Sequence, residues 1–149
     1  MQILLDTCIL GRLANTADPD RATALAALAK LRRRGETLFI TPQNLVEFRN
    51  FATRPIRVNG LGLTVPIAES LSASFEAQFP LLPETPDLFP AWKTIVGNLN
   101  IVGKLVHDAR LVAVGHVHSI SHVLTFNVAH FTHLATASPG IVVVDPVTV

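Results

Sequence analysis

Ile3-Leu4-Leu5-Asp6, close to the start of the chain, places three apolar residues directly before a carboxylate. A short continuous apolar run is typical of a strand that is buried on both faces of a parallel sheet. Similar runs follow at Leu38–Ile40, His122–Phe126 and Ile141–Val144. Because ligands of such sheets bind beyond the carboxyl ends of the strands, Asp6 stands where a functional site is expected.

Segments with helical patterns separate these strands. Asp18 as N-cap and Pro19 at the first helical position predict a helix that ends near Arg33. A second helix is expected to start at Thr41-Pro42. Residues 53–65 read as a loop, and further helices are expected at about 66–78, 87–99, 103–117 and 127–134. The alternation predicts an α/β fold: one domain over residues 1–149, with a doubly wound, Rossmann-like parallel sheet of four to five strands flanked by helices.

Composition narrows the class of protein. Hydrophobic residues make up 49% of the 149 positions and charged residues 15%, which favours a compact globule over disorder. No apolar stretch approaches the roughly twenty residues of a membrane span, and the start lacks the basic segment of a secretory signal. The single cysteine, Cys8, has no internal partner for a disulfide. A cytoplasmic protein is therefore expected.

Three carboxylates lie in apolar surroundings. Asp6 ends a strand, Glu47 borders the apolar arc of its helix, and Asp108 has leucine and valine as its neighbours three and four residues away. A buried carboxylate without a partner is costly, and a divalent cation would neutralise all three together. Hard cations such as Mg²⁺ prefer oxygen-only ligand sets. Taken singly, each acid also has a structural interpretation: a cap for Asp6, solvation for Glu47, and an ion pair with Lys104 or Arg110 for Asp108.

Four short stretches carry a resemblance to a known family. They are residues 4–10 (LLDTCIL), 41–48 (TPQNLVEF), 107–113 (HDARLVA) and 124–131 (LTFNVAHF). In this order and spacing the chain resembles the PIN-domain family, which includes the toxin ribonucleases of bacterial toxin–antitoxin pairs. The resemblance implies Mg²⁺- or Mn²⁺-dependent cleavage of RNA, with tRNA and mRNA as candidate substrates. It also implies an antitoxin protein as partner, and a homodimer.

The resemblance assigns roles residue by residue. The first three family acids fall on Asp6, Glu47 and Asp108, which become the expected catalytic, metal-binding residues. The fourth position is commonly Asp but here is Asn127, whose carbonyl can bind a metal but brings no charge. This departure leaves open whether one metal or two are bound. Thr7 and Thr125 lie beside these positions and could either support the carboxylates by hydrogen bonds or cap local backbone.

Basic residues gather in the first sixty positions, which hold nine of the twelve Lys and Arg. Arg32, Arg33 and Arg34 suit the C-terminal end of a helix dipole. The later group, at Arg49, Arg54 and Arg57, is the candidate for binding the phosphates that flank a cleaved bond in RNA.

Two rival functions follow from the same residues. A catalytically weakened, PIN-like RNA-binding or scaffold module is suggested by Asn127 alone. A phosphotransfer domain with Asp6 as nucleophile would need a second Asp two residues on, where Cys8 stands. A zinc site among the histidines at 116–133 is not favoured, because no acidic or thiolate partner clusters with them in the sequence.

Overall fold

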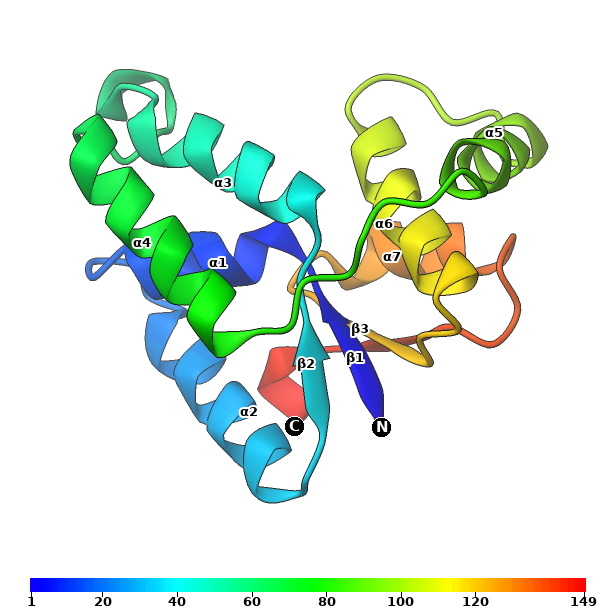
Figure 1. Ribbon diagram of the computed structural model, residues 1–149, viewed down its shortest axis with the longest axis horizontal. Helices are drawn as coiled ribbons and strands as arrows, with labels where there is room; N and C mark the ends of the chain where they lie inside the picture. Colours follow the sequence, from blue (N-terminus) through cyan, green and yellow to red (C-terminus); the bar gives the residue numbers. More distant parts are fainter.

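A computed structural model describes residues 1–149 and has a four-stranded sheet at its centre (Figure 1). Every neighbouring pair of strands is parallel. The strands lie in the order β2-β1-β3-β4, where β1 is Gln2–Leu5, β2 is Thr37–Phe39, β3 is His122–Leu124 and β4 is Val142–Val144. The predicted doubly wound, parallel α/β sheet is therefore confirmed, with four strands.

Helices cover both faces of the sheet (Figure 1). On one face lie α1 (Thr7–Ala14), α2 (Arg21–Arg33), α3 (Pro42–Thr53) and α4 (Val65–Gln78). On the other lie α5 (Leu88–Asn98), α6 (Leu105–Val117) and α7 (Val128–Ala135). Two short 3₁₀ helices, at Ile56–Val58 and Pro146–Thr148, complete the chain. No helix is both long enough and apolar enough to cross a bilayer.

The sheet separates two hydrophobic cores. In β1, Ile3 and Leu5 pack into the core under α1 to α4, whereas Leu4 packs into the core under α5 to α7. Successive residues of a strand point to opposite faces of the sheet. All three side chains are fully buried because helices cover both faces. Burial on both faces is the physical reason for the unbroken apolar run in the sequence.

The strand order reverses between β1 and β3. From β1 the chain passes to β2 on one side and returns later to β3 on the other. Leu5 pairs with Leu124, and the Asp6 amide donates to the Leu124 carbonyl at 3.0 Å. Asp6 and Thr125 therefore leave the sheet side by side at the reversal, where ligands of doubly wound sheets bind.

Helix α1 is an element that the sequence analysis missed. It has eight residues and includes the β-branched Thr7 and a glycine, so its intrinsic helix propensity is low. Asp6 caps it by accepting a hydrogen bond from the Cys8 amide at 3.4 Å. A Cβ on Gly11 would lie 3.1 Å from the Phe51 ring, so the glycine allows α1 to approach α3 closely. Tertiary packing, rather than local propensity, makes this segment helical.

The predicted start of α2 was wrong by two residues. The helix begins at Arg21, and Asp18 and Pro19 lie in the turn before it. The Asp18 carboxylate accepts a hydrogen bond from the Asp20 amide at 2.9 Å, which favours a turn over a helical start. Both acids also pair with Arg12 of α1, at 3.9 and 3.4 Å. The preference of these acids for a turn and an ion pair outweighs the capping pattern.

The start of α3 is tied to the end of β1. Thr41 and Asn44 form a capping box, in which each side chain accepts a hydrogen bond from the backbone amide of the other. The fully buried Asn44 also donates from Nδ2 to the Leu5 carbonyl at 3.0 Å. This link sets the start of α3 beside Asp6, and Glu47 follows less than one turn after Asn44.

Candidate active site

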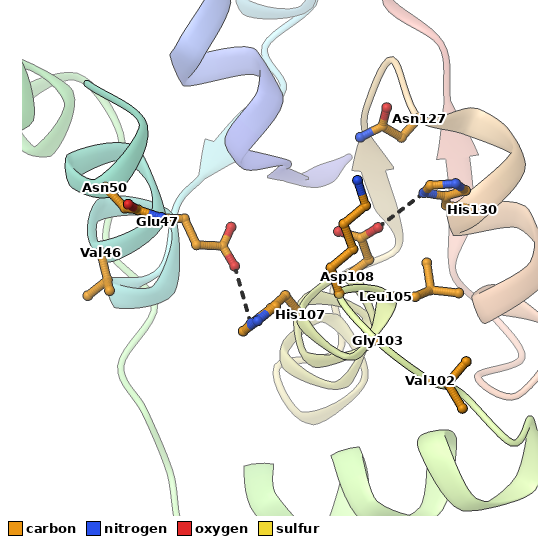
Figure 2. A pocket seen from close by; sticks show the side chains of 11 residues that line it. Val46, Glu47, Asn50, Val102, Gly103, Leu105, His107, Asp108, Asn127 and His130 are labelled. Atoms are coloured by element: carbon orange, nitrogen blue, oxygen red, sulfur yellow. Dashed lines mark hydrogen bonds and ion pairs between the residues drawn. The ribbon is translucent and has the colours of Figure 1, made fainter. Parts of the chain in front are cut away.

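A cleft of about 820 Å³ opens between α3 and the start of α6 (Figure 2). Figure 2 shows Glu47 entering from α3 on one side and Asp108 of α6 opposite, with Asn127 above Asp108 and His130 on the side of Asp108 away from Glu47. The cleft lies beyond the carboxyl ends of β1 and β3. Its lining consists of Val46, Glu47, Asn50, Val102, Gly103, Lys104, Leu105, His107, Asp108, Asn127 and His130.

Asp6 is not part of this lining and is only 3% exposed. Its Oδ2 accepts a hydrogen bond from the Thr125 hydroxyl at 2.6 Å, and its Oδ1 accepts from the Cys8 amide. The Thr125 oxygen in turn accepts from the Asn127 amide at 2.9 Å, which directs the hydroxyl proton toward Asp6. Burial, and then the charge of Asp6, raise the pKa of the Cys8 thiol above its ordinary range, so Cys8 is a protonated, partly buried side chain.

Glu47 is held by neutral donors at both carboxylate oxygens. Its Oε2 accepts from the Thr7 hydroxyl at 2.6 Å, and its Oε1 accepts from Gln43 Nε2 at 2.8 Å. Asn44 Nδ2 donates to Thr7 Oγ1 at 3.1 Å, so the Thr7 proton is free to point at Glu47. Across the cleft, His107 Nδ1 lies 3.9 Å from Glu47 Oε1. Hydrogen bonds to neutral groups orient the carboxylate without removing its charge.

Asp108 has a pKa that is raised to about 6. Burial is the largest cause, and the negative charge of Asp6 is the second. The Nδ1 atom of His130, 3.3 Å from Asp108 Oδ2, lowers the pKa, while the charge of Glu47 raises it. Asp108 therefore senses the charges of the other two acids, although the three come from different elements.

The donor set suits a hard divalent cation. It consists of carboxylate oxygens, and the pKa of Asp108 is raised first by burial and then by the charges of Asp6 and Glu47. As the side chains stand, no three His, Cys, Asp or Glu residues converge closely enough to enclose an ion. Carboxylates that repel one another stay apart, and an ion between them would replace that repulsion with attraction.

Asn127 lies at the cleft and is solvent-exposed. Although it is the residue at the N-cap position of α7, its side chain makes no capping hydrogen bond. Its amide is therefore available to a ligand in the cleft rather than committed to the helix.

The three arginines predicted to bind RNA lie outside the cleft lining. Arg49 forms an ion pair with Glu69 of α4. Arg54 donates to the Asn59 carbonyl at 2.8 Å and so closes the loop around the first 3₁₀ helix. Arg57 is exposed within that 3₁₀ helix and forms no ion pair. The structure does not bring these arginines together with the three acids.

Basic groups of the cleft were missed by the sequence analysis. Lys104 lines the cleft and forms no ion pair. Arg110, which the sequence offered as a partner for Asp108, forms an ion pair with Glu84 instead. The prediction that no acid accompanies the late histidines was wrong for His130, which contacts Asp108. A signal existed: His130 follows Asn127 by three residues and therefore shares its face of α7.

Comparisons with known proteins agree with the observed fold. The family model of the PIN domain matches residues 3–136. VapBC2 from Rickettsia felis, bound to a DNA fragment from its promoter, has a similar chain (14% identity, TM-score 0.73, covering 97% of this chain and 98% of that one). FitAcB from Neisseria gonorrhoeae is also similar (18% identity, TM-score 0.66, covering 97% of this chain and 97% of that one). VapC20 of Mycobacterium tuberculosis, a sarcin–ricin loop cleaving toxin, is 21% identical (TM-score 0.59, 81% and 86%). No curated protein sequence matches the chain significantly.

The raised pKa of Asp108 makes the stability of the metal-free protein depend on pH. Folded Asp108 keeps its proton up to about pH 6, whereas an unfolded carboxyl loses it near 3.8. The stabilisation by the protonated form is present at pH 4 and lost as the pH rises through 6. Between pH 4 and 7 we expect wild type to lose about 1 kcal/mol more than Asp108→Asn, after discounting for partial exposure. Urea unfolding in EDTA measures this difference, and parallel pH curves for the two proteins would contradict it.

Proposed function

The chain belongs to the PIN-domain family, and from this premise we propose that it is a metal-dependent endoribonuclease, the toxin of a toxin–antitoxin pair. The observation that carries the proposal is that Glu47 and Asp108 line one cleft, and that the charges of Asp6, at the strand-order reversal, and of Glu47 both act on Asp108. Toxin activity is supported by the fold shared with VapC20, which is described as a toxin that cleaves the sarcin–ricin loop. The RNA substrate of this chain, tRNA or mRNA among the candidates, is left open.

Asp6, Glu47 and Asp108 would hold Mg²⁺ or Mn²⁺, with Asn127 as a neutral fourth ligand. A divalent cation supplies the charge that lowers the pKa of a water nucleophile and offsets charge developing on the phosphate. Thr125 and Thr7 would orient the carboxylates of Asp6 and Glu47 for this role, since each donates a hydrogen bond to one oxygen of its partner. No nucleophilic side chain is needed, which agrees with the protonated state of Cys8.

Lys104 is the cleft residue best suited to bind a phosphate of the substrate. Its ammonium group is exposed in the cleft and pairs with no carboxylate, so it is free to meet an anion. Arg49, Arg54 and Arg57 lie farther out, and we propose that they contact phosphates that flank the cleaved bond. Such contacts add affinity that weakens with salt.

An antitoxin protein and a second copy of the chain are proposed as partners. The antitoxin follows from the toxin function and is consistent with the similarity to the VapBC2 and FitAcB structures. Self-association is supported by exposed apolar side chains on α4 and α5, including Ile67 (49% exposed) and Phe89 (64% exposed).

The phosphotransfer alternative is disfavoured by the surroundings of Asp6. Such a domain would need a second Asp two residues after Asp6, and that place is taken by Cys8, a protonated, partly buried thiol. The weakened RNA-binding alternative still depends on Asn127 alone. It predicts RNA binding without cleavage, so an RNA cleavage assay distinguishes it from a nuclease.

Metal dependence is the central test. Purified protein should cleave RNA in Mg²⁺ or Mn²⁺ and stop in excess EDTA. Asp6→Asn and Asp108→Asn should each lower the rate at least about 100-fold, because each removes a charge on which transition-state stabilisation depends. Glu76→Gln, which changes an exposed carboxylate on α4, should cleave at the wild-type rate. Equal cleavage in EDTA would exclude the metal mechanism, and RNA binding without any cleavage would favour the scaffold alternative.

The substitution Asn127→Asp tests the position at which the chain departs from the family pattern. A carboxylate of nearly the same shape should tighten metal binding and lower the Mg²⁺ concentration for half-maximal rate by about tenfold, an effect of about 1.4 kcal/mol. Metal titrations of cleavage measure the change. Because Asn127 makes no side-chain cap, loss of a helix cap does not confound the comparison. Superimposable titration curves would remove Asn127 from the metal site and leave the three acids in place.

Removing Lys104 should weaken substrate binding more than chemistry. For Lys104→Ala we expect KM to rise about tenfold with kcat little changed, and the salt dependence of binding to fall by the equivalent of about one phosphate contact. Lys93→Ala, which removes an exposed lysine of α5 outside the cleft lining, is the matched control. Arg49→Ala, Arg54→Ala and Arg57→Ala should give smaller increases. A normal KM for Lys104→Ala would show that the phosphate is held elsewhere.

A further inference from the structure

Gln43 is a buried polar residue of α3, one turn before Glu47, and only 8% of it is exposed. Its Nε2 donates two hydrogen bonds, each 2.8 Å long: one to Glu47 Oε1 and one to the main-chain carbonyl of His107. The second bond crosses from α3 to α6 and ends at the residue before Asp108. One side chain therefore contacts one of the three acids and the backbone next to another.

The orientation of the Gln43 amide is set by Arg110. Its Nη1 donates to Gln43 Oε1 at 2.9 Å, and its Nη2 donates to Glu84 Oε1 at 2.5 Å. A guanidinium group has only donors, so it must face the amide oxygen. The amide nitrogen then has to face Glu47 and the His107 carbonyl, which together use both of its hydrogens. Every polar atom of the Gln43 side chain is thereby satisfied.

We propose that Gln43 is a positioning residue for Glu47 and that Arg110 is the group that keeps the Gln43 amide in its productive orientation. The proposal rests on the proposed function, because it concerns Glu47 as a ligand of the metal. With Thr7 on Oε2 and Gln43 on Oε1, the Glu47 carboxylate is held from both sides without a countercharge. The bond to His107 additionally fixes the separation of α3 and α6, and with it the spacing between Glu47 and Asp108.

Substitutions at Gln43 and Arg110 can distinguish a residue that orients Glu47 from one that only stabilises the contact between α3 and α6. Gln43→Met keeps side-chain length and fills the same space, but it cannot donate to Glu47 or to the His107 carbonyl. Arg110→Met frees the amide to turn its oxygen toward Glu47 part of the time. Arg110→Lys retains a donor for Gln43 Oε1 and should rescue the arrangement. Gln78→Met, at an exposed glutamine of α4, is the matched control.

The experiment is Mn²⁺ binding by calorimetry to the full chain without RNA, with thermal unfolding in EDTA measured in parallel. We expect Gln43→Met to weaken Mn²⁺ binding by about tenfold, the effect typical of a residue that orients a metal ligand. Arg110→Met should weaken it less, whereas Arg110→Lys and Gln78→Met should bind as wild type does. Cleavage by Gln43→Met should recover when Mn²⁺ is raised in proportion to the lost affinity.

Three outcomes would overturn the proposal in whole or in part, and they are distinguishable. If Gln43→Met lowers the melting temperature but binds Mn²⁺ as tightly as wild type, Gln43 is only a brace and the nuclease function stands. If wild type itself binds no Mn²⁺, the proposed function fails, and the role of Gln43 toward a metal falls with it. Failure of Arg110→Lys to restore affinity, beside a weakened Gln43→Met, would overturn the assignment of Arg110.

Discussion

The burial of a carboxylate at the strand-order reversal is the constraint on which the rest of the site depends. Asp6 must leave water because Ile3, Leu4 and Leu5 bury the strand that ends at it. A buried charge requires compensation, and the Thr125 hydroxyl and the Cys8 amide supply it by donating to the two carboxylate oxygens. The negative charge of Asp6 also acts on Asp108, whose pKa is raised first by burial and then by this charge.

Neutral donors, rather than arginines, hold the acids of the cleft. Thr7, Gln43 and Thr125 donate to Glu47 and Asp6, and Asn44 orients Thr7. The arginines nearest to these elements are paired with other acids: Arg12 with Asp18 and Asp20, Arg49 with Glu69, and Arg110 with Glu84. An arginine beside the acids would cancel the negative charge and compete with a cation. Neutral donors fix direction and leave the charge available.

Features that depend on neighbouring residues could be predicted from the sequence, whereas features that depend on distant contacts could not. Strands buried on both faces leave unbroken apolar runs, so the sheet, the position of Asp6 and the start of α3 could be read locally. Helix α1 could not, because burial and its close contact with α3 stabilise it rather than its own residues. The contacts of Gln43 could not be predicted for a similar reason, because its partners His107 and Arg110 lie more than sixty residues away in the sequence. The assignment of Asp18 and Pro19 to α2 failed because turn and ion-pair bonds competed with the cap.

The two sides of the cleft belong to different cores. Glu47 is carried by α3, which packs with α1, α2 and α4 on one face of the sheet, whereas α6 carries Asp108 in the core of the other face. Neither core alone sets the distance between these carboxylates. Besides the sheet, the polar contacts that join the two sides are those of Gln43 with His107 and Arg110, and the 3.9 Å approach of His107 Nδ1 to Glu47 Oε1. Since apolar packing gives little directional control and hydrogen bonds give much, the spacing of the acids depends on a few polar side chains in the cleft wall.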